Sequence, residues 1–480
     1  MAKNFYESCM NDERKFDYLK FMHWLEQAEN MKWALLTPTD NKDVVFDWTS
    51  TMAIFRKYGL NDMFVEQWSS SKDTFRYVTS YQMRSYKKDI PLPTGAMDFL
   101  ELWSFIQEFE QKLKIIKVSK AEEKETYKFH KLPYDWLKKY LTAAAETKQL
   151  DANMELTIDN AAGMKDLNTV LKQYDATFLC RYLEVRFLLY LEKFKSRRLA
   201  NKCMSMVTSY MTMASEGIYV NLHPELLQEL SQIQQMFENI VKNINKTLQM
   251  DTQNIIPQEY FAKLETMQLQ VGDTYSKNTN ERLEGHYKDL NLQPNDYYGN
   301  ILQILKLLNK PQLDDSDREL LYKSPTLTVP KWEVIPRYVA QTNVLTIPFG
   351  LLREPFYNAA YVDIFKQSSL ASLMAKRILD PLLQMTANSN KDIATLPDII
   401  AVHSSYEVFF AYLDAKDIER YQKMFKMTSV EKVKQLFFIN EMYYRCEDED
   451  SPAEYGNTML MSYFNEAFEC KFKLLLQQVL

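Results

Sequence analysis

Apolar side chains recur at steps of three or four residues through most of this chain, which is the spacing of an amphipathic α-helix. The longest such stretch follows Pro224, a residue type favoured in the first turn of a helix. Its apolar positions are Leu227, Leu230, Ile233, Phe237, Ile240, Ile244 and Leu248. The same spacing predicts helices over Phe99–Lys114, Phe178–Phe194, Tyr298–Leu308 and Phe464–Leu480. Because Phe178–Phe194 is apolar on nearly every side, we expect this helix to be buried.

Strand signals are few along the chain. Asn343–Phe349 (NVLTIPF) contains β-branched residues and is bounded by Pro348 and Gly350, a pattern typical of a strand. Phe64–Glu66 is a shorter candidate. The pattern therefore predicts a mainly α fold with a small β component.

The length of 480 residues exceeds what one ordinary hydrophobic core holds, so two lobes are expected. A polar, Pro-bearing stretch at 309–331 separates a long helical region from a mixed one. This predicts a helical lobe over 1–308, a linker over 309–331 and a second lobe over 332–480. Only 9 glycines are present, which argues against a sandwich, a barrel or a Gly-rich nucleotide loop.

The charge and hydropathy of the chain exclude some partners. A net charge of -6 gives no general electrostatic reason to expect nucleic acid. No run reaches the roughly 18 apolar residues that a membrane span needs, so no transmembrane segment is predicted. The first residues (MAKNFYESCMNDERKFDYLK) lack the apolar core of a signal peptide, which predicts a cytoplasmic protein if Met1 is the natural start.

A search for catalytic residues finds no familiar arrangement. No two histidines are three or four residues apart, so no helix presents a two-histidine metal face. The cysteines form no CxxC pair, and the GxSxG, GxGxxG and phosphate-binding loop motifs are missing. A cysteine–histidine pair remains open, because such partners meet only in space. The histidines are His23, His130, His223, His286 and His403.

Five sequence blocks nevertheless resemble the neprilysin family of zinc metallopeptidases, in the family's order. The main one is Thr342–Tyr357 (TNVLTIPFGLLREPFY), which is similar to the family's strand followed by P-x-G-x-L-x-x-P-F-[FY]. The others are Ala2–Cys9 (AKNFYESC), Asp296–Asn300 (DYYGN), Lys434–Cys446 (KQLFFINEMYYRC) and Phe464–Cys470 (FNEAFEC). This resemblance implies a two-lobed neprilysin- and thermolysin-like architecture and, for the family, zinc-dependent peptide hydrolysis.

The resemblance also implies a state for each cysteine. The family bridges a cysteine near its start to one in the helical lobe, which corresponds to a disulfide between Cys9 and Cys203. Cys446 and Cys470 lack their usual partners in this chain and either pair with each other or stay reduced. Cys180 lies in a buried helical pattern and is expected to be a free thiol.

The family's zinc helix carries HExxH, in which two histidines bind zinc and the glutamate activates water. The equivalent helix here is Ser369–Leu383, where Lys376 and Asp380 stand at the histidine positions and Arg377 at the glutamate. A lysine ammonium has no lone pair for a metal, and a protonated arginine cannot act as a base. We expect Lys376 and Asp380 to form an ion pair instead, and Pro381 to shorten the helix.

The remaining family positions are also replaced. The third zinc ligand, a glutamate, corresponds to Pro397, and the aspartate that orients a histidine corresponds to Ala401. The substrate-positioning N-A-[FY] motif maps onto Ile335, Pro336 and the arginine that follows them. Asn343, in the retained strand, is the remaining candidate for substrate binding. No histidine lies between Cys446 and Phe464, where the family stabilises its tetrahedral intermediate.

These replacements predict a pseudopeptidase without zinc, which binds a peptide or a protein partner without cleaving it. Two alternatives stay open: proteolysis through an unrecognised site, and a structural relic with no ligand. The family works outside the cell or at its surface, whereas this chain shows no export signal.

Overall fold

A computed structural model describes most of the chain. The described residues are 1–12, 16–38, 44–60, 64–71, 74–81, 99–116, 124–145, 150–158, 160–195, 199–249, 256–272, 279–309, 336–339, 343–382, 396–443 and 462–469. The expected linker at 309–331 therefore lies almost entirely outside the described residues, as do Ile335, Cys446 and Cys470.

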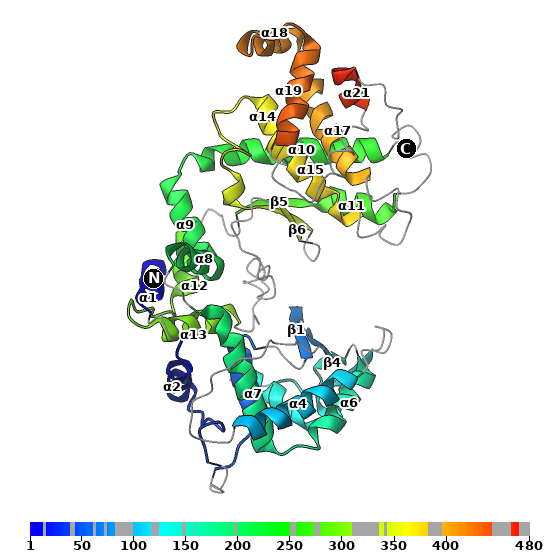
Figure 1. Cartoon of the computed structure of the whole chain (residues 1–480). Helices are drawn as coiled ribbons and strands as arrows, with labels where there is room; N and C mark the ends of the chain where they lie inside the picture. The colour runs from blue at the N-terminus through cyan, green and yellow to red at the C-terminus, as the bar shows by residue number, and fades with distance from the viewer. Residues whose placement is uncertain are drawn as a thin grey trace. The chain divides into compact units, whose positions relative to one another are not determined.

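The chain forms two compact units, and both are discontinuous in the sequence (Figure 1). The first comprises Met1–Met211 with Tyr287–Thr328, and the second Thr212–His286 with Val329–Leu480. This division differs from the expected lobes at 1–308 and 332–480. The reason is packing over long sequence distances, because the helix and strand within 212–286 pack and pair with C-terminal elements.

The first unit is mostly helical, as its apolar spacing predicts. Its helices are α1 (Ala2–Asn11), α2 (Tyr18–Glu29), α3 (Trp48–Lys57), α4 (Phe99–Ile115), η1 (Phe129–Lys131), α5 (Asp135–Ala144), α6 (Ala161–Leu171), α7 (Ala176–Leu191), η2 (Glu192–Phe194), α8 (Ala200–Tyr210) and α13 (Tyr297–Leu308). The predicted helices Phe99–Lys114, Phe178–Phe194 and Tyr298–Leu308 are confirmed as α4, α7 with η2, and α13.

Helix α7 is buried on all sides, as expected, and three of its buried residues have ionisable side chains. Glu184 accepts hydrogen bonds from the backbone N–H groups of Ala34 and Leu35, both at 2.7 Å. Arg181 donates to the carbonyl oxygen of Ala34, and Arg186 pairs with a glutamate of α4 at 3.0 Å. Each of these buried polar side chains is therefore hydrogen-bonded, which offsets the cost of removing it from water.

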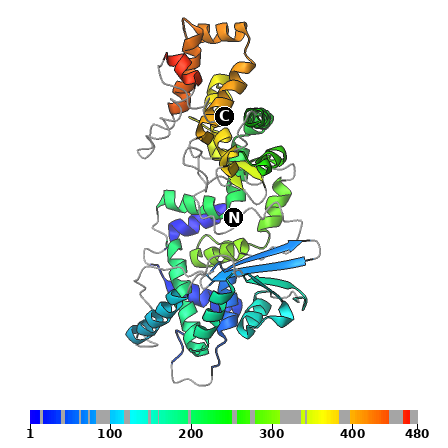
Figure 2. The ribbon, with the colours of Figure 1, turned by 90° about the vertical axis from the view of Figure 1, so that its right-hand side faces the viewer.

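The first unit also contains a four-stranded sheet of order β1-β2-β4-β3. Phe64–Glu66 proves to be the start of a longer strand that pairs antiparallel with the next one, and this hairpin is drawn in blue in Figure 2. The hairpin joins the shorter strands through a parallel β2–β4 pair. The strands are β1 (Phe64–Ser71), β2 (Thr74–Tyr81), β3 (Glu125–Lys128) and β4 (Glu155–Ile158).

The disulfide between Cys9 and Cys203 is present, as the resemblance implied. It joins α1 to α8 with Cα atoms 5.7 Å apart and a sequence separation of 194. A hydrogen bond also joins α13 to α1, because the side-chain amide of Asn300 donates to Ser8 Oγ at 2.9 Å. Cys180 is a buried free thiol, and burial raises its pKa to about 12, so it is an unreactive thiol near neutral pH.

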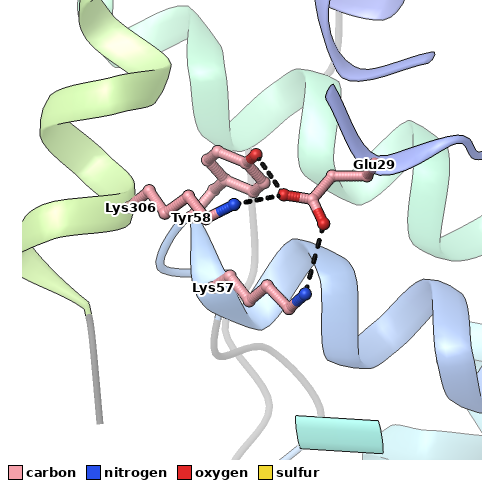
Figure 3. A network of polar contacts seen from close by, with 4 residues as sticks. All are labelled: Glu29, Lys57, Tyr58 and Lys306. Carbon is pink, nitrogen blue, oxygen red and sulfur yellow. Dashed lines mark hydrogen bonds and ion pairs between the residues drawn. The ribbon is translucent and has the colours of Figure 1, made fainter. Parts of the chain in front are cut away.

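A buried carboxylate joins three helices of this unit (Figure 3). Glu29, at the end of α2, has a side chain only 8% exposed. It accepts hydrogen bonds from Tyr58 Oη at 2.6 Å and Lys306 Nζ at 2.7 Å, and it pairs with Lys57 Nζ at 3.2 Å. Burial alone would raise the pKa of Glu29, but the hydrogen bonds from Lys306 and Tyr58 and the charge of Lys57 outweigh burial and lower the pKa.

Replacing Glu29 by Gln is expected to lower the free energy of unfolding at pH 7 by about 2 kcal/mol, because charge-assisted hydrogen bonds are lost inside the protein. A carboxylate with a depressed pKa stabilises the fold above its unfolded pKa and stops doing so as the pH falls through its folded value. The difference from wild type, measured by urea unfolding, should therefore shrink as the pH is lowered from 7 to about 3.5. Glu26→Gln, on the exposed face of the same helix, is the control and should change little. A difference that is independent of pH would contradict this account.

The second unit combines ten helical segments among the described residues with a small sheet. The helices are α9 (Thr212–Leu222), α10 (Leu226–Leu248), α11 (Gln258–Thr266), α12 (Thr279–Tyr287), η4 (Phe349–Leu351), α14 (Asp363–Lys366) with the π-helix η5 (Gln367–Ala371), α15 (Ser372–Ile378), α17 (Leu396–Ala411), α18 (Ala415–Met424), α19 (Val430–Tyr443) and α21 (Ser462–Phe468), counting α14, η5 and α15 as one. The helix expected after Pro224 is confirmed as α10. Of the expected Phe464–Leu480 helix, only the start falls within the described residues.

The sheet of the second unit has the order β5-β7-β6, with β5 (Gln268–Val271), β6 (Arg337–Val339) and β7 (Val344–Ile347). The expected strand Asn343–Phe349 is confirmed as β7, which occupies the centre. It pairs parallel with β5 and antiparallel with β6. Helices α10 and α15 lie along one face of this sheet (Figure 1). No helix in the described part of the chain combines the length and apolar character needed to cross a lipid bilayer.

Candidate functional site

The segment that the resemblance equates with the zinc helix is longer than expected at its N-terminal end. Helical structure begins at Asp363, passes through the π-helix η5 and continues as α15 to Ile378. Short π-helical segments often occur at functional sites. The face of η5 and α15 that points inward is fully buried, with Leu370, Met374 and Ile378 in the core. This packing fixes the direction in which the charged residues at the end of α15 extend.

Lys376 forms an ion pair with a residue of a different helix. Its Nζ lies 3.0 Å from Oδ1 of Asp398 in the first turn of α17. Both side chains are about one fifth exposed, at 21% and 18%. A carboxylate in the first turn of a helix also interacts favourably with the helix dipole. The ion pair therefore connects α15 to α17, the two helices that the resemblance assigns to the metal ligands.

The expected pairing of Lys376 with Asp380 stays a prediction, although the charge of Lys376 does act to lower the pKa of Asp380. Asp380 also accepts weak hydrogen bonds from Nη1 of Arg377, at 3.5 and 3.4 Å to its two oxygens. The sequence suggested the i,i+4 partner because local spacing is visible in it, whereas Asp398 is brought near only by the packing of two helices. Burial raises the pKa of Asp380, although the charges of Arg377 and Lys376 act in the opposite direction.

Pro397 and Ala401 present no group that could bind a metal. Pro397 lies in the first turn of α17, where its missing N–H costs no helical hydrogen bond. Ala401 is 1% exposed and belongs to the hydrophobic core. The positions assigned to the zinc site thus hold two cations, one carboxylate bonded to a cation, one proline and one alanine. These residues do not fit a zinc ion, which needs imidazole, thiolate or free carboxylate donors. Among the described residues, no group of three or more His, Cys, Asp or Glu is arranged to hold a metal ion.

Asn343 is engaged inside the protein. Its backbone has a positive φ of 57°, a conformation that asparagine tolerates better than most residues. Its amide donates to the carbonyl oxygen of Lys263 and to Oγ1 of Thr266, both at 2.8 Å, and its oxygen accepts from Tyr338 Oη at 3.0 Å. Asn343 therefore connects the start of β7 to α11, and both of its amide hydrogens are donated within the protein.

Pro336, which belongs to the expected substrate motif, is buried directly before β6. β6 is an edge strand of the described sheet. Pro336 removes one N–H from the approach to this edge. Its role in substrate binding stays a prediction.

The sequence analysis missed a buried polar layer between two hydrophobic cores of this unit. One core surrounds α10, α15 and the sheet, and the other surrounds α19 and α21. Between them, Ser372 and Ser405 are hydrogen-bonded at 2.7 Å, and the Asn440 amide donates to Ser368 Oγ at 2.7 Å. A hydrophobicity pattern assigns serine to the protein surface. Only the packing of η5 against α17 therefore reveals this layer.

A second network also escaped the sequence analysis, because its members come from three helices. Glu407 of α17 accepts hydrogen bonds from Asn243 Nδ2 of α10 at 3.1 Å and from Tyr463 Oη of α21 at 2.9 Å. His403 stacks on Tyr463, and its Nε2 lies 3.8 Å from Glu407. Burial lowers the pKa of His403 below its ordinary value, so this histidine is neutral near pH 7.

Comparison with known proteins identifies the fold. Neither family models nor curated protein sequences give a match. Solved structures do: the zinc metalloprotease Zmp1 of Mycobacterium tuberculosis, bound to an inhibitor, superposes with a TM-score of 0.57 at 14% identity over 99% of this chain and 88% of that one. PepO of Lactobacillus rhamnosis HN001 gives 0.57 at 13% identity over 98% and 88%. A Haemonchus galactose-containing glycoprotein complex gives 0.56 at 14% identity over 98% and 88%.

The chain has the fold of the neprilysin-family zinc metalloproteases. This confirms the resemblance that the five sequence blocks indicated, and it confirms a mainly helical architecture with few strands. At 13–14% identity the likeness establishes the neprilysin fold alone. The chemistry of the site therefore has to be argued from the residues of this chain.

Proposed function

We propose that this neprilysin-fold protein is a pseudopeptidase, which binds a peptide or protein ligand and does not hydrolyse it. The observation that carries the proposal is the ion pair of Lys376 with Asp398 at 3.0 Å. It puts a fixed positive charge at a position assigned to a zinc-binding histidine, and it uses one of the two nearby carboxylates. The other carboxylate, Asp380, is bonded to Arg377.

Each step of zinc-dependent hydrolysis lacks its residue under this assignment. A lysine ammonium has no lone pair to coordinate a metal. Arginine stays protonated and cannot take a proton from water. Pro397 and Ala401 supply neither the third ligand nor the group that orients a histidine. Two cations at one site also repel a divalent metal ion.

The retained sheet edge supports peptide binding. β6 is an edge strand of the three-stranded sheet, and an extended peptide adds to such an edge through backbone hydrogen bonds. β6 spans only Arg337–Val339, and Pro336 precedes it, so few backbone groups are offered. We therefore expect side chains, more than backbone pairing, to determine which ligand binds.

Incubation of the purified chain with peptide pools tests the proposal. We expect saturable binding and no cleavage products by mass spectrometry, with added zinc and with a chelator alike. An active zinc metalloprotease of the same fold serves as the positive control for the pools. Chelator-sensitive cleavage would overturn the proposal, and chelator-insensitive cleavage would point to proteolysis through another site. Absence of binding to any pool or tissue extract would favour a structural role without a ligand.

A further inference from the structure

The two cations at the end of α15 differ in how well their charges are compensated. Lys376 lies 3.0 Å from a carboxylate oxygen. The two contacts of Arg377 with Asp380, at 3.4 and 3.5 Å, exceed the 2.7–2.9 Å that is usual for a charge-assisted bond. Both contacts use one nitrogen, Nη1. Within the described residues, Arg377 therefore has N–H groups left for another acceptor.

The exposure of Arg377 makes these groups accessible. Its side chain is 31% exposed, more than Lys376, Asp380 or Asp398. Arg377 is thus the residue of the cluster best placed to exchange an internal partner for an external one.

We propose that Arg377 is the recognition residue of this site and binds a carboxylate of the ligand peptide. The inference rests on the proposed function and adds the chemical class of the ligand. A guanidinium presents a planar fork of donors that matches both oxygens of a carboxylate. At the position where the resemblance places the catalytic glutamate of the peptidases, this chain has the positive charge of Arg377. The site therefore selects ligands that carry a negatively charged group.

The carboxylate has two sources in a peptide, the C-terminus and an acidic side chain. Four fluorescein-labelled decapeptide pools separate them: a free or amidated C-terminus, each with acidic residues included or with their amides in their place. We expect the wild-type chain to bind pools that contain carboxylates about 10- to 100-fold more tightly than the amidated, acid-free pool, as charge-assisted hydrogen bonds imply. Fluorescence anisotropy measures each affinity.

Variants assign this preference to Arg377. Arg377→Gln should abolish it, and Arg377→Lys should keep part of it, because the charge remains without the fork. Arg420→Gln removes an equally charged, exposed residue of α18 and is the matched control, expected to bind as wild type does. Asp380→Asn removes the internal competitor and should tighten binding of the carboxylate pools several-fold, a test that does not depend on the stability of the Arg377 variants.

Three results would overturn the inference, each in a different way. Equal affinity of the wild-type chain for all four pools would refute carboxylate recognition and leave the proposed peptide binding intact. No binding to any pool would refute the proposed function and this inference together. Unchanged preference in Arg377→Gln, with an unchanged melting temperature, would show that another residue recognises the carboxylate.

Discussion

A chain in which Lys376, Arg377, Asp380 and Pro397 are replaced by His, Glu, His and Glu is expected to bind one zinc ion. The substitutions supply two imidazoles and a carboxylate from adjacent helices, which is the ligand set of a catalytic zinc site. They also remove both cations that oppose a metal. A dissociation constant on the order of 1 µM or tighter, about 8 kcal/mol of binding free energy, is expected against no measurable binding in wild type.

Zinc per chain after dialysis, measured by mass spectrometry, checks this prediction. Zinc should also raise the melting temperature of the variant and leave that of wild type unchanged. The matched control carries Gln, Gln, Asn and Gln at the same four positions, which removes the cations without adding metal ligands. A folded variant that retains no zinc would mean that positions 376, 380 and 397 do not converge, and that the assignment of the replaced site is wrong.

Removing the Cys9–Cys203 disulfide is expected to lower the free energy of unfolding by about 3–5 kcal/mol. The bond closes a loop of 194 residues in sequence separation, and the entropy lost by the unfolded chain grows with loop length. Both cysteines are fully buried, so alanine at both positions preserves most of the packing of α1.

Urea unfolding of the Cys9→Ala/Cys203→Ala variant measures this effect. Wild type treated with a reducing agent should unfold at nearly the same urea concentration as the variant, whereas Cys180→Ala should keep the response to reduction because Cys180 forms no disulfide. If reduction leaves the wild-type midpoint in place, the disulfide does not stabilise the fold as argued.

Periodic helices were the part of the fold that could be predicted from the residues. Helices α4, α7, α10 and α13 each extend over at least three turns, so their apolar faces stand out from the rest of the chain. The strand β7 was recognisable because β-branched residues and flanking turn residues coincide there. In contrast, β2, β3, β4, β5 and β6 were missed, since strands of three to eight residues carry little periodic signal.

Long-range contacts set the limit of prediction at the site. The residues on α15 were identified in advance, but Asp398 was missed because it meets Lys376 only when α15 packs against α17. The grouping of 212–286 with the C-terminal residues was missed for the same reason. The disulfide was foreseen only through the family resemblance, because the spacing of Cys9 and Cys203 does not itself specify a bond.

Because the second unit is discontinuous in the sequence, its first segment is synthesised well before the elements with which it folds. Strand β5 leaves the ribosome before its neighbour β7, and α10 before the helices α15 and α17 on which it packs. Until α15 and α17 have been synthesised, the apolar face of α10 cannot pack against them and is exposed to binding by a chaperone. A gene fragment that begins at residue 332 would encode β6 and β7 without β5 or α10, and so would specify an incomplete core.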